Sequence, residues 1–202
     1  MTYPEFYEQV SSITLYDPLS DFLGSFDGGK ITFNYLQIVQ MAGHSCPTVA
    51  GAYLMTYKAL ESLYKGEIPV RGEIKVEFKE NIEEGVAGVI ANVVTNITGA
   101  TRITGFKGLN GKFVRHSLMS FDNPIPSSAR FTRIDNGKAV DVYYNPSSIS
   151  ANPQMGTLMQ KMMIDIATEE EQNAFKEMWQ QRVKQILIDN ADNQEVISIE
   201  NL

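Results

Sequence analysis

The spacing of hydrophobic and polar residues changes along the chain, and each spacing predicts one kind of element. Where every second residue is apolar, a half-buried strand is expected, and where apolar residues recur every three or four positions, an amphipathic helix is expected. Alternation typical of strands covers residues 30–35, 70–78, 131–134 and 140–144. Helical spacing covers residues 3–10, 18–23, 47–65, 155–166 and 168–188.

Local signals sharpen the ends of several elements. Pro47 and Gly66 bracket the clearest helix, because proline is favoured at the first helical position and glycine just after the last. The spacing of Thr168 and Glu171 is that of a capping box, which predicts the start of the last helix. Asn136-Gly137 lies between two strand patterns and predicts a hairpin turn.

Two segments fit more than one kind of element. Residues 35–42 fit either a helix or a strand, and the nearly continuous apolar run of residues 86–97 fits a deeply buried strand or a helix. Residues 112–121 predict a further strand. The whole pattern predicts an α+β fold, with a mixed or antiparallel sheet packed against helices. We expect an α+β core in residues 1–146 and a C-terminal helical arm in residues 147–202.

The predicted arm differs from the core in composition. It holds the only tryptophan of the chain, Trp179, on a wide apolar stripe, so we expect it to dock either on a partner subunit or on its own domain. Met155, Met159 and Met162 lie at helical spacing and predict adaptable packing. The acidic end, from Asp189 to Leu202, predicts a frayed, solubilising tail.

Charge and cysteine content narrow the function classes. The 202 residues carry a net charge of −7, divided as −3 in residues 1–66, +1 in 67–145 and −5 in 146–202. No basic stripe for nucleic acid is present, and no apolar run is long enough for a membrane span. The N-terminus lacks the pattern of a secretory signal, so we expect a cytoplasmic protein. The single cysteine, Cys46, excludes an intrachain disulfide and a zinc site with two thiolates from one chain.

The strongest chemical signal is Gly43-His44-Ser45-Cys46-Pro47, at the start of the clearest helix. Proline disfavours helical geometry in the residue before it, so Cys46 is expected to be extended and to cap the helix. His44 and Cys46 should then project to the same side. The positive end of the helix dipole favours the thiolate of Cys46.

Three uses of this pair stay open from the residues alone. His44 and Cys46 fit half of a site for zinc or another divalent transition metal, open to water or a small molecule. Cys46 also fits a catalytic nucleophile with His44 as its base. In the third interpretation, Cys46 is structural and the chain is an interaction module that dimerises through its C-terminal helices. His116, the only other histidine, is the candidate for a further metal ligand.

A glycine-rich segment offers a second candidate site. Residues 105–111 carry glycine at every third position, and such a loop is able to present backbone N–H groups to an anionic ligand. Lys107 and Arg102 would add positive charge. A plain loop between strands explains the segment equally well.

The motif around His44 and Cys46 resembles the Gly-His-x-Cys-Pro signature of the FmdE family, which is named after a component of formylmethanofuran dehydrogenase. The resemblance covers roughly residues 30–188. It implies an α+β core, a metal-binding site that uses His44 and Cys46, and a homodimer in which C-terminal helices exchange. The residues that carry the resemblance are 43–47, 49–53, 71–72, 97–100, 105–108 and 168–183.

The chain also departs from the family pattern. Many members have a further histidine where this chain has Ala42, and many have cysteine in the segment that matches residues 92–100. Some end in a cysteine-rich zinc finger, which is missing here. The resemblance therefore implies a mononuclear site with an unknown small molecule, and neither a dehydrogenase complex nor methanofuran chemistry.

Overall fold

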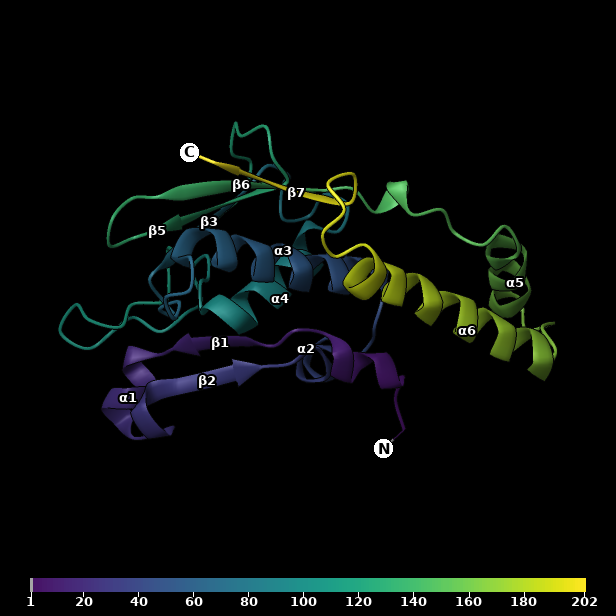
Figure 1. The fold of residues 1–202 in the computed structure, drawn as a ribbon, viewed down its shortest axis with the longest axis horizontal. Helices are drawn as coiled ribbons and strands as arrows, with labels where there is room; N and C mark the ends of the chain where they lie inside the picture. Colours follow the sequence, from purple (N-terminus) through teal and green to yellow (C-terminus); the bar gives the residue numbers. More distant parts are fainter. Residues whose placement is uncertain (1) are drawn as a thin grey trace.

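The computed structural model describes residues 2–202. Figure 1 shows a sheet on one side, a layer of two helices beneath it, and a small two-stranded sheet on the far side of those helices. Two further helices form an arm that extends away from this body. The arrangement confirms the predicted α+β class.

The strands form two sheets. The smaller is an antiparallel hairpin of β1 and β2, and the larger has the order β4-β3-β5-β6-β7. In the larger sheet only the β3–β4 pair is parallel. The strands are β1 Ile13–Tyr16, β2 Lys30–Phe33, β3 Ile74–Phe78, β4 Met119–Ser120, β5 Ala129–Arg133, β6 Ala139–Tyr144 and β7 Ile197–Asn201.

The helices lie between and beside the sheets. The α-helices are α1 Pro18–Leu23, α2 Tyr35–Ala42, α3 Pro47–Tyr64, α4 Ala87–Thr98, α5 Gln154–Met163 and α6 Glu169–Lys184. Short 3₁₀ segments cover Glu5–Gln9, Asp27–Gly29 and Pro146–Ser148, and α6 continues into a π-helical turn, Gln185–Asp189. Within residues 2–202, no helix has both the length and the apolar content to cross a membrane.

The central helix α3 organises the core. It packs against α4, β6, β7 and the π-helical turn, and twelve of its eighteen residues are buried. The larger sheet turns Val76, Phe131 and Val142 inward, and none of these side chains is accessible. Burial of such side chains contributes roughly 1.5–3 kcal/mol each. The body of α3 is therefore anchored in the core from Val49 onward.

Most of the predicted elements are confirmed, and the two open segments are helices. Residues 35–42 form α2, because Asn34 and Gln37 make a capping box at its start. Residues 87–98 form α4, which ends at Gly99 with φ 76°. The capping box of Thr168 and Glu171 opens α6 as predicted.

Two predictions are wrong. Residues 112–121 form only the two-residue strand β4, because Phe113 and Ser117 have φ of 62° and 60° and turn the chain out of extended geometry. The acidic end is not frayed: β7 pairs with β6 over five residues, and Val196 and Ile197 are buried. The last strand returns the chain to the sheet, and the division at residue 146 stays a prediction.

Candidate functional site

The turn between α2 and α3 carries the His-x-Cys motif. Gly43 ends α2 in the left-handed region, with φ 77°, which turns the chain toward α3. Cys46 is extended, with φ −149° and ψ 169°, and is the N-cap residue of α3. This confirms the prediction that Pro47 makes Cys46 a helix cap. Cys46 Sγ accepts a hydrogen bond from the Val49 N–H at 3.4 Å.

The two candidate side chains flank a buried residue. His44 is exposed, Ser45 is buried and Cys46 is half-buried. His44 Nδ1 lies 3.1 Å from the carbonyl oxygen of Ala42 and donates to it when Nδ1 carries the proton. That tautomer leaves the lone pair on Nε2, which is how metal-binding histidines are commonly oriented.

Ser45 anchors the turn to two other elements. Its hydroxyl is hydrogen-bonded to the hydroxyl of Tyr35 in α2 at 2.9 Å, and its carbonyl oxygen accepts from Trp179 Nε1 in α6 at 2.9 Å. Gln180 Nε2 donates to the same oxygen at 3.5 Å. The indole of the C-terminal arm therefore docks on the motif itself, within its own chain.

Tyr144 at the end of β6 holds the other side of the turn. Its hydroxyl donates to the Pro47 carbonyl oxygen at 2.8 Å. Its ring packs where a side chain of residue 51 would be, since a Cβ on Gly51 would lie 2.2 Å from two ring carbons. The sequence pattern missed Tyr144 because β6 and α3 are distant in sequence. A glycine in the middle of a strong helix was the only signal.

Burial sets the protonation of the surrounding hydroxyls. It raises the pKa of Tyr35 and of Tyr144, and the charge of a Cys46 thiolate raises both further. The Arg182 guanidinium opposes this effect at Tyr144. Both tyrosines therefore stay protonated, and neither is suited to be a base at neutral pH. Tyr144 donates to the Pro47 carbonyl oxygen, whereas either hydroxyl of the Tyr35–Ser45 pair is able to be the donor.

A pocket opens beside the first turns of α3. Its volume is about 620 Å³, and Thr48 and Tyr144 are among its lining residues, whereas His44, Ser45 and Cys46 are not. Met55, Phe78 and Ile90 supply apolar walls. A pocket of this size and mixed lining is typical of small-molecule sites.

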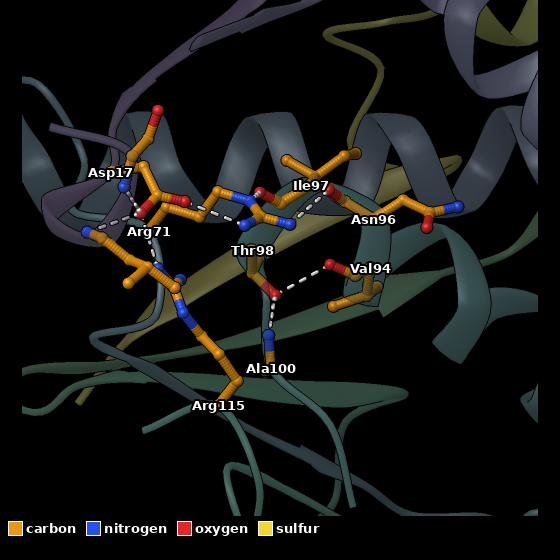
Figure 2. A network of polar contacts seen from close by, with 10 residues as sticks. Asp17, Arg71, Val94, Asn96, Ile97, Thr98, Ala100 and Arg115 are labelled. Carbon is orange, nitrogen blue, oxygen red and sulfur yellow. Dashed lines mark hydrogen bonds and ion pairs between the residues drawn. The ribbon is translucent and has the colours of Figure 1, made fainter. Parts of the chain in front are cut away.

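A second polar cluster, which sequence reasoning missed, joins three distant residues (Figure 2). Asp17 Oδ2 accepts from Arg71 Nη1 at 2.9 Å, and Asp17 Oδ1 accepts from Arg115 Nη2 at 2.6 Å. Arg71 also donates to the carbonyl oxygens of Asn96 and Ile97, near the end of α4. We call Asp17, Arg71 and Arg115 the arginine network.

Two glycines make room for this network. A Cβ on Gly72 would lie 2.2 Å from Arg115 Nη1, and a Cβ on Gly99 would lie 2.7 Å from the same atom. Burial tends to raise the pKa of Asp17, but the Ser20 N–H and the two guanidinium groups hold it below its usual value. The network is therefore a charged, buried structural centre.

Comparison with known families decides where the chain belongs. Residues 41–196 match the family described as FmdE, molybdenum formylmethanofuran dehydrogenase operon. The chain belongs to the FmdE family. The match covers His44, Cys46, Arg71, Arg115 and the docking helix α6, but begins after Asp17. In this FmdE-family chain the anion of the arginine network thus comes from outside the matched region.

Other comparisons give less. A tungsten formylmethanofuran dehydrogenase FmdE-like protein from Syntrophus aciditrophicus has a similar crystal structure, with a TM-score of 0.41 and 11% sequence identity. The alignment covers 84% of this chain and 72% of that chain. No curated protein matches the sequence.

The third predicted ligand of this FmdE-family chain lies elsewhere. The last turn of α3 lies beside the start of β3. Arg133 joins them, because it donates to the carbonyl oxygen of Leu63 in α3 and is the strand partner of Ile74 in β3. Because β4 runs parallel to β3, His116, which precedes β4, lies at this Ile74 end of the sheet. Cys46 caps the opposite end of α3, whose 18 residues span about 27 Å. Within a single chain, His116 therefore lies at the opposite end of α3 from His44 and Cys46.

The donor atoms at the motif fit half of a metal site. An imidazole nitrogen and a thiolate are good ligands for zinc and similar ions. Residues 2–202 hold no group of three or more histidine, cysteine or acidic side chains placed around one point. A metal bound to His44 and Cys46 would therefore take its other ligands from water, a small molecule or a second chain.

Proposed function

We propose that this FmdE-family chain binds a divalent transition metal, zinc or a similar ion, through His44 Nε2 and Cys46 Sγ. The observation that carries the proposal is that hydrogen bonds already hold both ligand atoms, the imidazole nitrogen of His44 and the sulfur of Cys46, in place. The Ala42 carbonyl orients the imidazole, and the Val49 N–H in the first turn of α3 donates to Cys46 Sγ. Zinc bound there would act as a Lewis acid toward a small ligand.

The surrounding residues would prepare the pair and admit the ligand. Tyr144 and Trp179 fix the backbone on both sides of Cys46, so the two donors need little reorganisation on binding. The pocket of about 620 Å³ beside Thr48 would hold the small molecule, with its apolar part against Met55 and Phe78. Its polar part would face the motif.

We further propose that the protein is a homodimer through the arm. A groove of about 380 Å³ between α5 and α6 is lined by Met159, Met163, Phe175 and Trp179, which are almost entirely apolar at its surface. Met163 is 78% exposed, as in an unpartnered interface. Trp179 lines this groove and also donates to the Ser45 carbonyl oxygen. A second copy in the groove would therefore lie close to His44 and Cys46, where it is able to add a ligand.

Metal analysis tests the proposal. Protein purified without a metal-affinity tag is measured by mass spectrometry for bound metals, as wild type and as the Cys46→Ser and His44→Ala variants. We expect close to one metal per chain in the wild type and a large loss in both variants. His116→Ala shows whether a second chain supplies His116 as a metal ligand, because it lowers the metal content only in that case. Equal metal content in wild type, Cys46→Ser and His44→Ala would refute the proposal.

Sedimentation equilibrium tests the dimer. We expect Met163→Glu to produce monomers, because a charge in the groove opposes its burial. Ile134→Glu is the matched control, since Ile134 is also exposed, at 52%, but lies on the hairpin between β5 and β6. A monomeric wild type, or equal behaviour of both variants, would contradict this part of the proposal.

One observation favours a second function, a metal-free cysteine nucleophile. Cys46 is half-buried and therefore reachable, while the described residues supply no third ligand. In this case, alkylation of metal-free protein by iodoacetamide would be fast near neutral pH and would slow in His44→Ala, because the imidazole would act as the base. A slow wild-type reaction that His44→Ala leaves unchanged would exclude it.

A further inference from the structure

A small pocket beside the arginine network has the features of an anion site. It has a volume of about 290 Å³ and lies between the start of α1, the turn before β3 and the loop before β4. Its walls include Arg71, Gly72, Glu73, Lys112 and Arg115. Two arginines and a lysine therefore line the same pocket.

The charges around this pocket do not balance. Arg71, Lys112 and Arg115 are cationic, while Asp17 and Glu73 are the anionic groups that face them. The side chains of Asp17 and Arg115 are only 5% and 7% exposed. The excess positive charge is that of Lys112, whose side chain is exposed, so it would attract an anion from solution.

Unpartnered polar atoms point to the same place. Within residues 2–202, three buried side-chain polar atoms have no hydrogen-bond partner. Two of them belong to the surroundings of Asp17: Arg115 Nη1 and the hydroxyl of Ser20, whose N–H binds Asp17. Arg115 Nη1 lies against Gly72 and Gly99, whose Cβ atoms would come within 2.2 and 2.7 Å of it, and Gly72 also lines the pocket. Buried donors without partners are rare and commonly mark a missing ligand or water.

The surrounding chain favours an anion over a neutral ligand. Residues 85–121 contain four cationic side chains and no aspartate or glutamate, although the whole protein carries −7. This stretch includes the glycine-rich residues 105–111, for which the sequence left open an anion site or a plain loop between strands. Such a local excess of positive charge raises the concentration of anions nearby.

We propose that this pocket binds a small oxyanion, a carboxylate or a phosphate, between Lys112 and the guanidinium of Arg115. The anion supplies the negative charge that Asp17 and Glu73 leave unmatched, and it accepts hydrogen bonds from these cationic donors. The site is independent of His44 and Cys46, which cap the other end of α3. Its ligand therefore contacts residues 111–115 rather than His44 and Cys46.

Titration calorimetry with inorganic phosphate and with acetate tests the site, at constant ionic strength set with sodium chloride. We expect saturable binding of at least one of these anions, with one site per chain. Lys112→Gln should weaken it by about tenfold, because a charge-assisted contact is lost. Lys107→Gln is the matched control: it removes the same charge from the same loop, but Lys107 does not line the pocket.

The outcomes separate the explanations. Selective weakening by Lys112→Gln supports the site, and the preferred anion identifies its chemical class. Absence of saturable binding for both anions would overturn the proposal, as would equal weakening by the two variants, which would indicate diffuse attraction. A crystal structure grown in the presence of phosphate that shows only water beside Arg115 would also overturn it. Both substituted lysines are exposed, so the variants are expected to fold.

Discussion

The two ends of α3 carry opposite kinds of polar site. At its start, His44 is exposed, Cys46 is half-buried, and the two donors have no third partner within the described residues. Beyond its other end, Asp17 and Arg115 are almost fully buried and bind each other and Arg71. One site is open and incomplete, and the other is closed and charged.

The open site is suited to binding a ligand, whereas the buried network contributes to folding stability. A metal or substrate needs reachable donor atoms, so a site that serves it leaves donors unsatisfied. A buried ion network is stabilising only when its charges remain paired, and removal of one member leaves a charge in a low-dielectric interior. We therefore expect substitutions in the arginine network to affect folding, and substitutions at the motif to affect ligand binding.

The largest expected effect follows from Asp17→Asn. Asparagine still accepts from the Leu19 and Ser20 N–H groups as a helix cap, so the change mainly removes the charge that pairs Arg71 and Arg115. We expect the free energy of unfolding, measured with urea, to fall by about 3–5 kcal/mol. The matched control is Asp135→Asn.

Asp135 binds Arg133 as tightly in geometry, at 2.7 Å, but its side chain is 45% exposed. Water screens this pair, so the control should change stability by less than about 1 kcal/mol. Equal losses in the two variants would show that burial adds nothing to the network.

Acid should reproduce part of the Asp17→Asn effect. Burial tends to raise the pKa of Asp17, but hydrogen bonding and the two arginines keep it below its ordinary 3.8 in the folded protein. A lowered folded pKa contributes stability above about pH 3.8, and this contribution is lost as the pH falls through the folded value.

The difference in unfolding free energy between wild type and Asp17→Asn is therefore expected to be constant from pH 7 to 5 and to shrink below pH 4. Other carboxylates titrate in both proteins and cancel in the difference. Urea unfolding at several pH values measures it. A difference that grows toward low pH would contradict the assigned direction of the pKa shift.

The sequence predicts the motif well and the network poorly, for a physical reason. His44 and Cys46 are neighbours in the chain, and Pro47 determines the local geometry of the cap. Asp17 and Arg115 are 98 residues apart, and only the packing of α1 against the loop before β4 joins them. Periodicity and capping signals are local, so they report helices and turns and say little about such long-range pairs.

The two wrong predictions have the same origin. Left-handed turns at Phe113 and Ser117 interrupt the strand predicted for residues 112–121, and the spacing of apolar residues does not report such turns. The charge of the C-terminal end hid the apolar start of β7, where Ile197 and the preceding Val196 are buried. The α+β class survived because it depends on many elements. The ligand set beyond His44 and Cys46 stays a prediction.

Gly51→Ala tests how Tyr144 supports the open site. The new methyl group would overlap the Tyr144 ring and displace its hydroxyl from Pro47, so we expect a loss of about 1–3 kcal/mol in unfolding free energy. Gly156→Ala in α5 is the matched control. Nothing lies within 4 Å of its new Cβ, so it should stabilise by about 0.5–1 kcal/mol. If both variants gain stability, the contact between Tyr144 and α3 is not tight.

The smallest change in stability is expected at the cap of α3. Cys46 caps α3 with a long hydrogen bond of 3.4 Å, whereas serine is among the preferred cap residues. In metal-free protein, Cys46→Ser should therefore leave the unfolding free energy unchanged or raise it by up to about 1 kcal/mol, while Cys46→Ala should lower it by about 1 kcal/mol. Urea unfolding in the presence of a chelator measures both. A clear loss in Cys46→Ser would mean that the sulfur is held for packing. If Cys46→Ser keeps or raises the unfolding free energy but loses the bound metal, the cysteine serves ligand binding and does not contribute to folding stability.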